Sequence, residues 1–161
     1  MTALKKWVII FTIVVLCIIG TIAGVYVNAM GPKKEASTEA FNKAKQEGEL
    51  VTMDSFYMYN GEETFSVVVG ENADREKMAV WIPEDDKQKI KVEKYSDGKS
   101  MEEIRKIVVK EHAPEEIISI KLGMERNVAL WEVTYIDKAN RYNYDYYDFK
   151  TGEWLKYYRS I

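Results

Sequence analysis

Residues Leu50 to Ile82 read LVTMDSFYMYNGEETFSVVVGENADREKMAVWI, and this stretch decides the fold of the chain. Asn60-Gly61 separates two runs that are rich in aromatic and β-branched residues, which is a strong signal for a β-hairpin. A third run ends at Pro83, a residue that closes strands because it has no amide hydrogen. We therefore predict three antiparallel strands, and the alternating run from Lys89 to Tyr95 supplies a fourth.

A helix is predicted directly before these strands. Ser37 is a suitable N-cap, residues 38–47 carry a short apolar stripe, and Gly48 is placed to end the helix. The first half of the chain beyond residue 36 therefore reads as one helix followed by four strands.

The second half repeats this order. Ser100-Met101-Glu102-Glu103 is a capping box, and the helix that it begins is stopped by Pro114. Four strand-like runs follow, and Thr151-Gly152 forms the turn between the last two. A shift of 67 residues aligns the two halves, which indicates a tandem duplication.

The predicted fold class is α+β. It consists of an N-terminal transmembrane helix and two tandem units, residues 37–96 and 97–161, each with a helix packed on a four-stranded antiparallel sheet. Units of about 60 residues bury little core alone, so we expect the two to share an interface.

The transmembrane helix is predicted over residues 7–27, WVIIFTIVVLCIIGTIAGVYV, which contain no charge. A helix of this length spans about 30 Å, the thickness of a bilayer's hydrocarbon core. Residues 1–6 then form a cytoplasmic tail, residues 28–36 a linker, and the long C-terminal part lies outside the cell. We expect a single-pass protein of the cell membrane. A cleaved signal peptide ending at Val27-Asn28-Ala29 is the alternative.

Composition limits the partners. Residues 28–161 hold all 26 acidic residues and 21 of the 23 basic ones, since only Lys5 and Lys6 precede them, which leaves a net charge of −5. Nucleic acid is therefore a poor partner, because binding it needs clustered positive charge. A protein or a neutral ligand fits the charge better, and the oligomeric state is not predicted.

Residues for catalysis, cofactors or metals are few, so no enzyme, cofactor or metal site is predicted. The single cysteine, Cys17, lies in the apolar run, and the single histidine, His112, reads as a cation at a helix C-terminus. Zinc has too few of its usual ligands. Glu84-Asp85-Asp86 is a dense acidic cluster that fits a solvated loop better than a calcium site. A calcium-binding loop also needs a glycine at its bend, and this segment has none.

Aromatic residues gather in the last two strands. Tyr142, Tyr144 and Tyr146 fall on one side of a strand, and Trp154 and Tyr158 lie on the next strand. Cross-strand aromatic pairs stabilise a solvated sheet face. Exposed tyrosine and tryptophan are also typical of protein interfaces, so these five residues are our candidate partner-binding residues.

Two segments resemble a known domain type. The run from Tyr146 to Trp154, YYDFKTGEW, is similar to the closing hairpin of PepSY-type repeats, and Trp131 to Tyr135 resembles the strand before it. In the first half, residues 79–86 (AVWIPEDD) occupy the position that corresponds to this hairpin. They lack the Thr-Gly-Glu of the motif and so depart from it. The complete layout resembles the TseB/YpmB family of Firmicutes cell-wall elongation regulators, whose units are PepSY or cystatin-like.

This resemblance implies a non-enzymatic regulator that binds a class B penicillin-binding transpeptidase, and it supplies no catalytic residues. PepSY domains are also associated with the restraint of proteases. An inhibitor or chaperone of an exported protease is therefore the second hypothesis, and an enzyme acting on wall glycan is the third.

Overall fold

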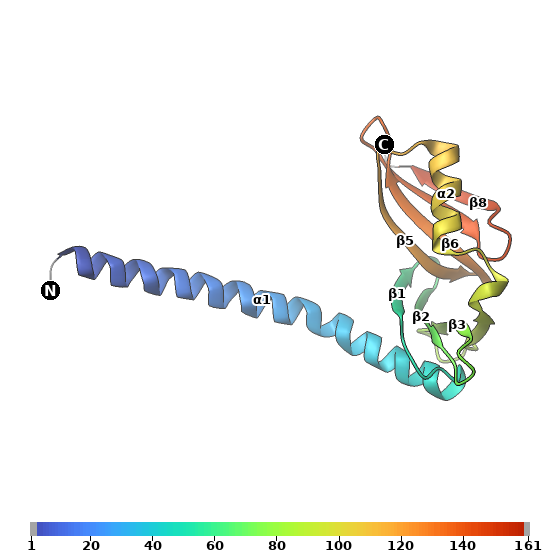
Figure 1. The fold of residues 1–161 in the computed structure, drawn as a ribbon, viewed down its shortest axis with the longest axis horizontal. Helices are drawn as coiled ribbons and strands as arrows, with labels where there is room; N and C mark the ends of the chain where they lie inside the picture. The colour runs from blue at the N-terminus through green and yellow to red at the C-terminus, as the bar shows by residue number, and fades with distance from the viewer. Residues whose placement is uncertain (1–2, 160–161) are drawn as a thin grey trace. The chain divides into compact units, whose positions relative to one another are not determined.

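The structure is a computed structural model. It describes residues 3–159, and the side chains of residues 7–8, 10–21 and 31–159. The chain forms two compact units, Met1–Thr38 and Glu39–Ile161 (Figure 1). The predicted tail at residues 1–6 and the candidate cleavage site Val27-Asn28-Ala29 lie outside the described side chains.

The first helix, α1, corrects the prediction for the N-terminal part. It runs without interruption from Ala3 to Glu47, so residues 28–36 are helical, and Pro32 lies inside the helix. Ser37 is likewise an interior residue instead of an N-cap. The apolar run is thus one part of a longer helix that goes on through Lys33, Lys34 and Glu35.

The predicted membrane span is also wrong. Among the residues whose placement the structure describes, no helix combines the length and the apolar character that crossing a membrane requires. The single-pass topology and the localisation expected from residues 7–27 are therefore withdrawn.

The second unit contains two four-stranded antiparallel sheets. The first has the order β1-β2-β3-β4, and Asn60 pairs with Thr64 to close the predicted hairpin. The isolated bridge between Leu50 and Asn72 precedes this sheet, so the first strand begins later than predicted. Its strands are β1 (Ser55–Asn60), β2 (Thr64–Glu71), β3 (Lys77–Pro83) and β4 (Lys91–Lys94).

The second sheet has the order β5-β6-β7-β8 and follows a short 3-10 helix and α2. The capping box at Ser100 is confirmed, because its hydroxyl accepts from the Glu103 amide and the Glu103 carboxylate accepts from the Ser100 amide. The elements are η1 (Tyr95–Asp97), α2 (Met101–His112), β5 (Glu116–Glu125), β6 (Val128–Ile136), β7 (Tyr142–Asp148) and β8 (Trp154–Arg159).

Two hydrophobic cores hold the second unit together. The smaller core lies between the C-terminal end of α1 and one face of the first sheet, where Ala44 contacts the cluster that includes Val68 and Val80. The larger core contains the other face of the first sheet, Ile104 and Val108 of α2, and buried residues of the second sheet. The central strands of the first sheet are therefore buried on both faces, which explains their continuous apolar runs.

The two sheets share an interface, as expected from the small size of each half. The indole nitrogen of Trp81 donates to the Gly123 carbonyl at 2.8 Å, and the Trp81 ring meets Phe149 edge-on at 5.4 Å. Gly123 also permits close packing, because a Cβ there would lie 2.3 Å from the Tyr59 ring. Residues from both halves thus form one core.

Candidate functional site

The hairpin of β7 and β8 carries the predicted partner-binding residues. Asp148 fixes its turn, since its Oδ1 accepts from the amides of Lys150 at 2.9 Å and Thr151 at 2.8 Å. Gly152 has φ 73°, the left-handed conformation that glycine adopts without steric cost. A Cβ at Gly152 would also lie 3.2 Å from Ile107. Thr151 and Gly152 therefore fix the conformation of the turn between β7 and β8.

Four of the five predicted residues lie on one face of the second sheet, which we call the tyrosine face: Tyr142, Tyr144, Tyr146 and Tyr158. Tyr144 pairs directly with Tyr158, and strand alternation turns these side chains away from α2. Tyr142 and Tyr158 are 46% and 55% exposed, but Tyr146 is only 7% exposed. Tyr146 thus contributes little accessible surface.

Trp154 lies on the opposite face. A register irregularity falls between Tyr146, which pairs with Lys156, and Tyr147, which pairs with Trp154, so Leu155 is an extra residue in β8. The bulge reverses the alternation, and Trp154 stacks on Tyr157 with ring centroids 5.5 Å apart. The five predicted residues therefore lie on both faces of the second sheet, four on the tyrosine face and Trp154 on the other.

Polar contacts fix the tyrosine face. The Tyr146 hydroxyl donates to Glu132 at 3.0 Å, and its ring meets Tyr158 edge-on at 5.8 Å. Lys156 lies over both rings and forms an ion pair with Glu125. Burial raises the pKa of Glu125, but hydrogen bonds from Lys156 and Tyr59 outweigh it, so the pKa lies below its ordinary value. The charges on this face are therefore matched.

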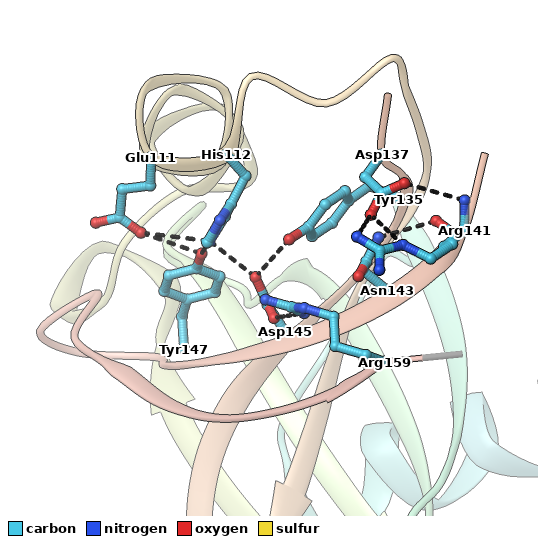
Figure 2. Close-up of polar contacts among 9 residues, drawn as sticks. All are labelled: Glu111, His112, Tyr135, Asp137, Arg141, Asn143, Asp145, Tyr147 and Arg159. Carbon is cyan, nitrogen blue, oxygen red and sulfur yellow. Dashed lines mark hydrogen bonds and ion pairs between the residues drawn. The ribbon is translucent and has the colours of Figure 1, made fainter. Parts of the chain in front are cut away.

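Behind the tyrosine face lies a polar group that the sequence analysis missed, and we call it the Asp145 cluster: His112, Tyr135, Asp145 and Arg159 (Figure 2). The side chain of Asp145 is completely buried. Its carboxylate accepts from Arg159 Nη1 at 2.6 Å, faces His112 Nε2 at 2.9 Å and accepts from the Tyr135 hydroxyl at 3.1 Å. One carboxylate thus joins α2, β6, β7 and β8.

Electrostatics in the Asp145 cluster follow from this burial. Burial lowers the pKa of Arg159, but its hydrogen bond to Asp145 outweighs this and raises the pKa above its ordinary value. Burial and the neighbouring Asp145 charge both raise the pKa of Tyr135, and the same two causes raise that of Tyr147. Both phenols therefore stay protonated and available as hydrogen-bond donors at neutral pH.

The geometry around His112 fits an anchoring role. Nε2 lies 2.9 Å from Asp145 and 3.3 Å from the Tyr147 hydroxyl, and the imidazole stacks on Tyr135 at 5.4 Å. A histidine that acts as a base needs a nucleophile within hydrogen-bond reach. The partners of His112 within the described part of the chain are carboxylates and phenols. His112 ends α2, as the sequence indicated, but Asp145 is its main partner.

The turn between β6 and β7 is fixed in the same way. Arg141 donates to Asp137 Oδ2 through Nη2 at 2.8 Å and Nε at 3.0 Å, and Asn143 donates to the Arg141 carbonyl. Hydrogen bonds from Arg141 lower the pKa of Asp137 to about 2. This turn sets where Tyr142 begins β7.

Glu84, Asp85 and Asp86 form an exposed loop with local charge pairing. Lys43 lies 3.5 Å from Asp86, and the Lys87 amide donates to Asp85 at 3.0 Å. Among the described residues no group of three or more histidine, cysteine, aspartate or glutamate side chains is arranged to hold a metal ion.

Comparison with known proteins gives the family. The chain is 36% identical over 148 residues to the "Probable cell wall elongation regulator TseB" of Bacillus subtilis strain 168, an alignment that covers 92% of each chain. The chain belongs to the TseB family of cell wall elongation regulators. Residues 39–83 match the family model described as "Cell wall elongation regulator TseB-like domain". This match covers the end of α1 and the strands β1 to β3.

A solved structure supports the same family. The YpmB protein from Bacillus subtilis superposes with a TM-score of 0.71 at 35% identity, covering 76% of this chain and 96% of that one. The resemblance seen in the sequence is therefore confirmed at the level of the family.

Proposed function

We propose that this TseB family member regulates cell-wall elongation without catalysing a reaction, by binding a class B penicillin-binding transpeptidase. The observation that carries the regulatory role is the identity shared with the Bacillus subtilis TseB over nearly the whole chain. The transpeptidase partner follows from the family resemblance in the sequence.

The geometry of the Asp145 cluster supports a non-enzymatic role. His112 is held between Asp145 and Tyr147, and the contacts of the buried Asp145 carboxylate join four elements of the fold. Both oxygens of the buried carboxylate are already taken by partners within the domain, which fits a role in joining elements of the fold.

Exposed aromatic residues on β8 support the binding role. Trp154, Leu155, Tyr157 and Tyr158 are each between 43% and 55% exposed. Tyrosine and tryptophan are enriched at protein interfaces because each buries a large area while ordering few rotatable bonds.

Affinity capture tests this function. The full chain, carrying an affinity tag, is recovered from growing cells, and co-purified penicillin-binding proteins are visualised with a fluorescent penicillin. We expect a class B transpeptidase with the unmodified chain, and a reduced amount with Trp154→Ala combined with Tyr158→Ala. Lys106→Ala, on the exposed side of α2, is the matched control and should capture as the unmodified chain does. Capture of no penicillin-binding protein by the unmodified chain would refute the proposal.

A further inference from the structure

The outer edge of β8 differs from the other three sheet edges of the second unit. β1 and β5 lie close to each other where the two sheets meet. β4 has only four residues, Lys91–Lys94, and three of these are charged. Within residues 3–159, β8 pairs with β7 alone, so one side of its backbone is available for hydrogen bonding.

The charged side chains of β8 do not protect its edge as they do in other edge strands, although the bulge at Leu155 interrupts the strand. Edges are usually defended by charged side chains that would be buried unpaired if another strand docked. β8 has two cations, but Lys156 forms an ion pair with Glu125 and Arg159 one with Asp145. Both charges are thus matched inside the domain, and the other four residues of β8 are aromatic or aliphatic.

The edge is ordered before any partner arrives. Arg159 ties the C-terminal end of β8 to the buried Asp145, and the guanidinium lies 4.4 Å from the Tyr157 ring centroid. Trp154 stacks on Tyr157, and Gly152 fixes the turn before the strand. A binding strand that is already ordered loses less entropy when a partner binds.

We propose that β8 is a docking edge, and that its occupant is an extended, uncharged segment of another protein that adds a fifth strand to the second sheet. Main-chain hydrogen bonds would supply affinity, as in other cases of strand addition. Alternate side chains of the segment would contact Tyr158 on one face and the Trp154–Tyr157 pair on the other. This inference deepens the proposed function, because it names the surface and the chemistry of the partner.

Charge determines which occupant fits. An uncharged segment leaves the ion pairs of Lys156 and Arg159 intact, whereas a charged one would bury an unpaired charge. Residues 39–161 hold 25 acidic and 19 basic residues, a net charge of −6. This charge repels a second copy of the chain and attracts a partner whose segment is flanked by basic residues.

A designed peptide tests the proposal. The probe alternates valine and threonine over six residues and carries two lysines at each end. It is titrated into the full chain while hydrogen–deuterium exchange is followed by mass spectrometry. We expect slower exchange in residues 154–159 on binding, and roughly tenfold weaker binding by Leu155→Lys combined with Tyr158→Lys. The same peptide with glutamates at its ends should bind more weakly than the lysine-flanked one.

Val109→Lys is the matched control, because Val109 is a similarly exposed apolar residue on α2. It should bind the peptide as the unmodified chain does. Three results would overturn the proposal: no added protection in residues 154–159, equal binding by the β8 variant and the control, or self-association of the chain through β8. Peptide binding at β8 without transpeptidase capture would leave the docking edge standing and remove the proposed partner. Capture of a transpeptidase by the chain that carries Leu155→Lys and Tyr158→Lys would leave the proposed partner standing and remove the docking edge.

Discussion

His112 Nε2 lies 2.9 Å from Asp145 Oδ2, and this contact links the last residue of α2 to a fully buried carboxylate in the middle of β7. Arg159, near the end of the described chain, meets the other oxygen of the same carboxylate. The helix and the edge strand of the second sheet are thus held by one residue. The stability of the hairpin that carries the exposed aromatic residues depends on it.

Replacing Asp145 with asparagine should destabilise the fold. The variant keeps the shape but removes the negative charge, which leaves Arg159 without its counter-ion. Breaking a buried ion pair costs about 3–5 kcal/mol, and the partial exposure of Arg159 reduces this to about 2–4 kcal/mol. Urea unfolding of the full chain measures the change. Asp137→Asn, in the exposed turn before β7, should cost clearly less, and equal losses for the two variants would count against the anchoring role.

Arg159→Ala should loosen β8 without unfolding the sheet. Removing the guanidinium frees the C-terminal end of the strand, so hydrogen exchange in residues 154–159 should be faster, while exchange in β6 changes little. Arg141→Ala is the comparison, because its ion pair with Asp137 lies in an exposed turn. If Arg159→Ala and Arg141→Ala gave the same exchange in β8, the ion pair with Asp145 would have no part in ordering the strand.

Gly152→Ala should lower stability by about 1–2 kcal/mol. Its φ of 73° is strained for alanine, and the added methyl group would approach Ile107 at 3.2 Å. Thermal unfolding of the variant gives the loss. Glu153→Ala changes the next, exposed residue of the same turn and should be close to neutral. A Gly152→Ala variant as stable as the unmodified chain would show that the turn relaxes.

Glu103 should make stability depend on acid pH. Hydrogen bonds from the Ser100 amide and hydroxyl lower its pKa from 4.5 to about 2. A carboxylate with a lowered folded-state pKa contributes stability that is fully present above about pH 4.5 and is lost as the pH falls through about 2. The stability difference between the unmodified chain and Glu103→Gln should therefore shrink between pH 6 and pH 2. Denaturant unfolding at both pH values measures it, and a difference that stayed constant would contradict this assignment.

Local sequence signals predicted much of the second unit. Asn60-Gly61 predicted the first hairpin, and the Ser100 capping box predicted the start of α2, because both depend on residues within one turn. The alternation in β7 likewise placed Tyr142 and Tyr144 on one face. These features need no information from distant parts of the chain.

Predictions failed where the structure depends on how far a helix continues or on where a strand is interrupted by a bulge. The helix α1 continues through Pro32 to Glu47, so residues 7–27 are not a separate helix. The sequence placed Trp154 and Tyr158 on one strand, but the bulge at Leu155 puts their side chains on opposite faces. Alternation alone does not reveal such a bulge.

The Asp145 cluster was missed because its members are far apart in the sequence. His112, Tyr135, Asp145 and Arg159 come from four different elements. One signal was available: Asn143 and Asp145 are polar and alternate with the tyrosines, on the face expected to pack against the helix. A carboxylate on a core-facing position needs a buried partner.

Site-specific photo-crosslinking tests most directly whether the β7–β8 hairpin binds the transpeptidase. A benzophenone amino acid is placed at Tyr158 of the full chain in growing cells, and at Asp86, an exposed loop residue of the first sheet, as the control. The proposed function predicts that a class B penicillin-binding transpeptidase is crosslinked from position 158 and not from position 86. Recovery of no penicillin-binding protein from position 158, or equal recovery from both positions, would contradict it.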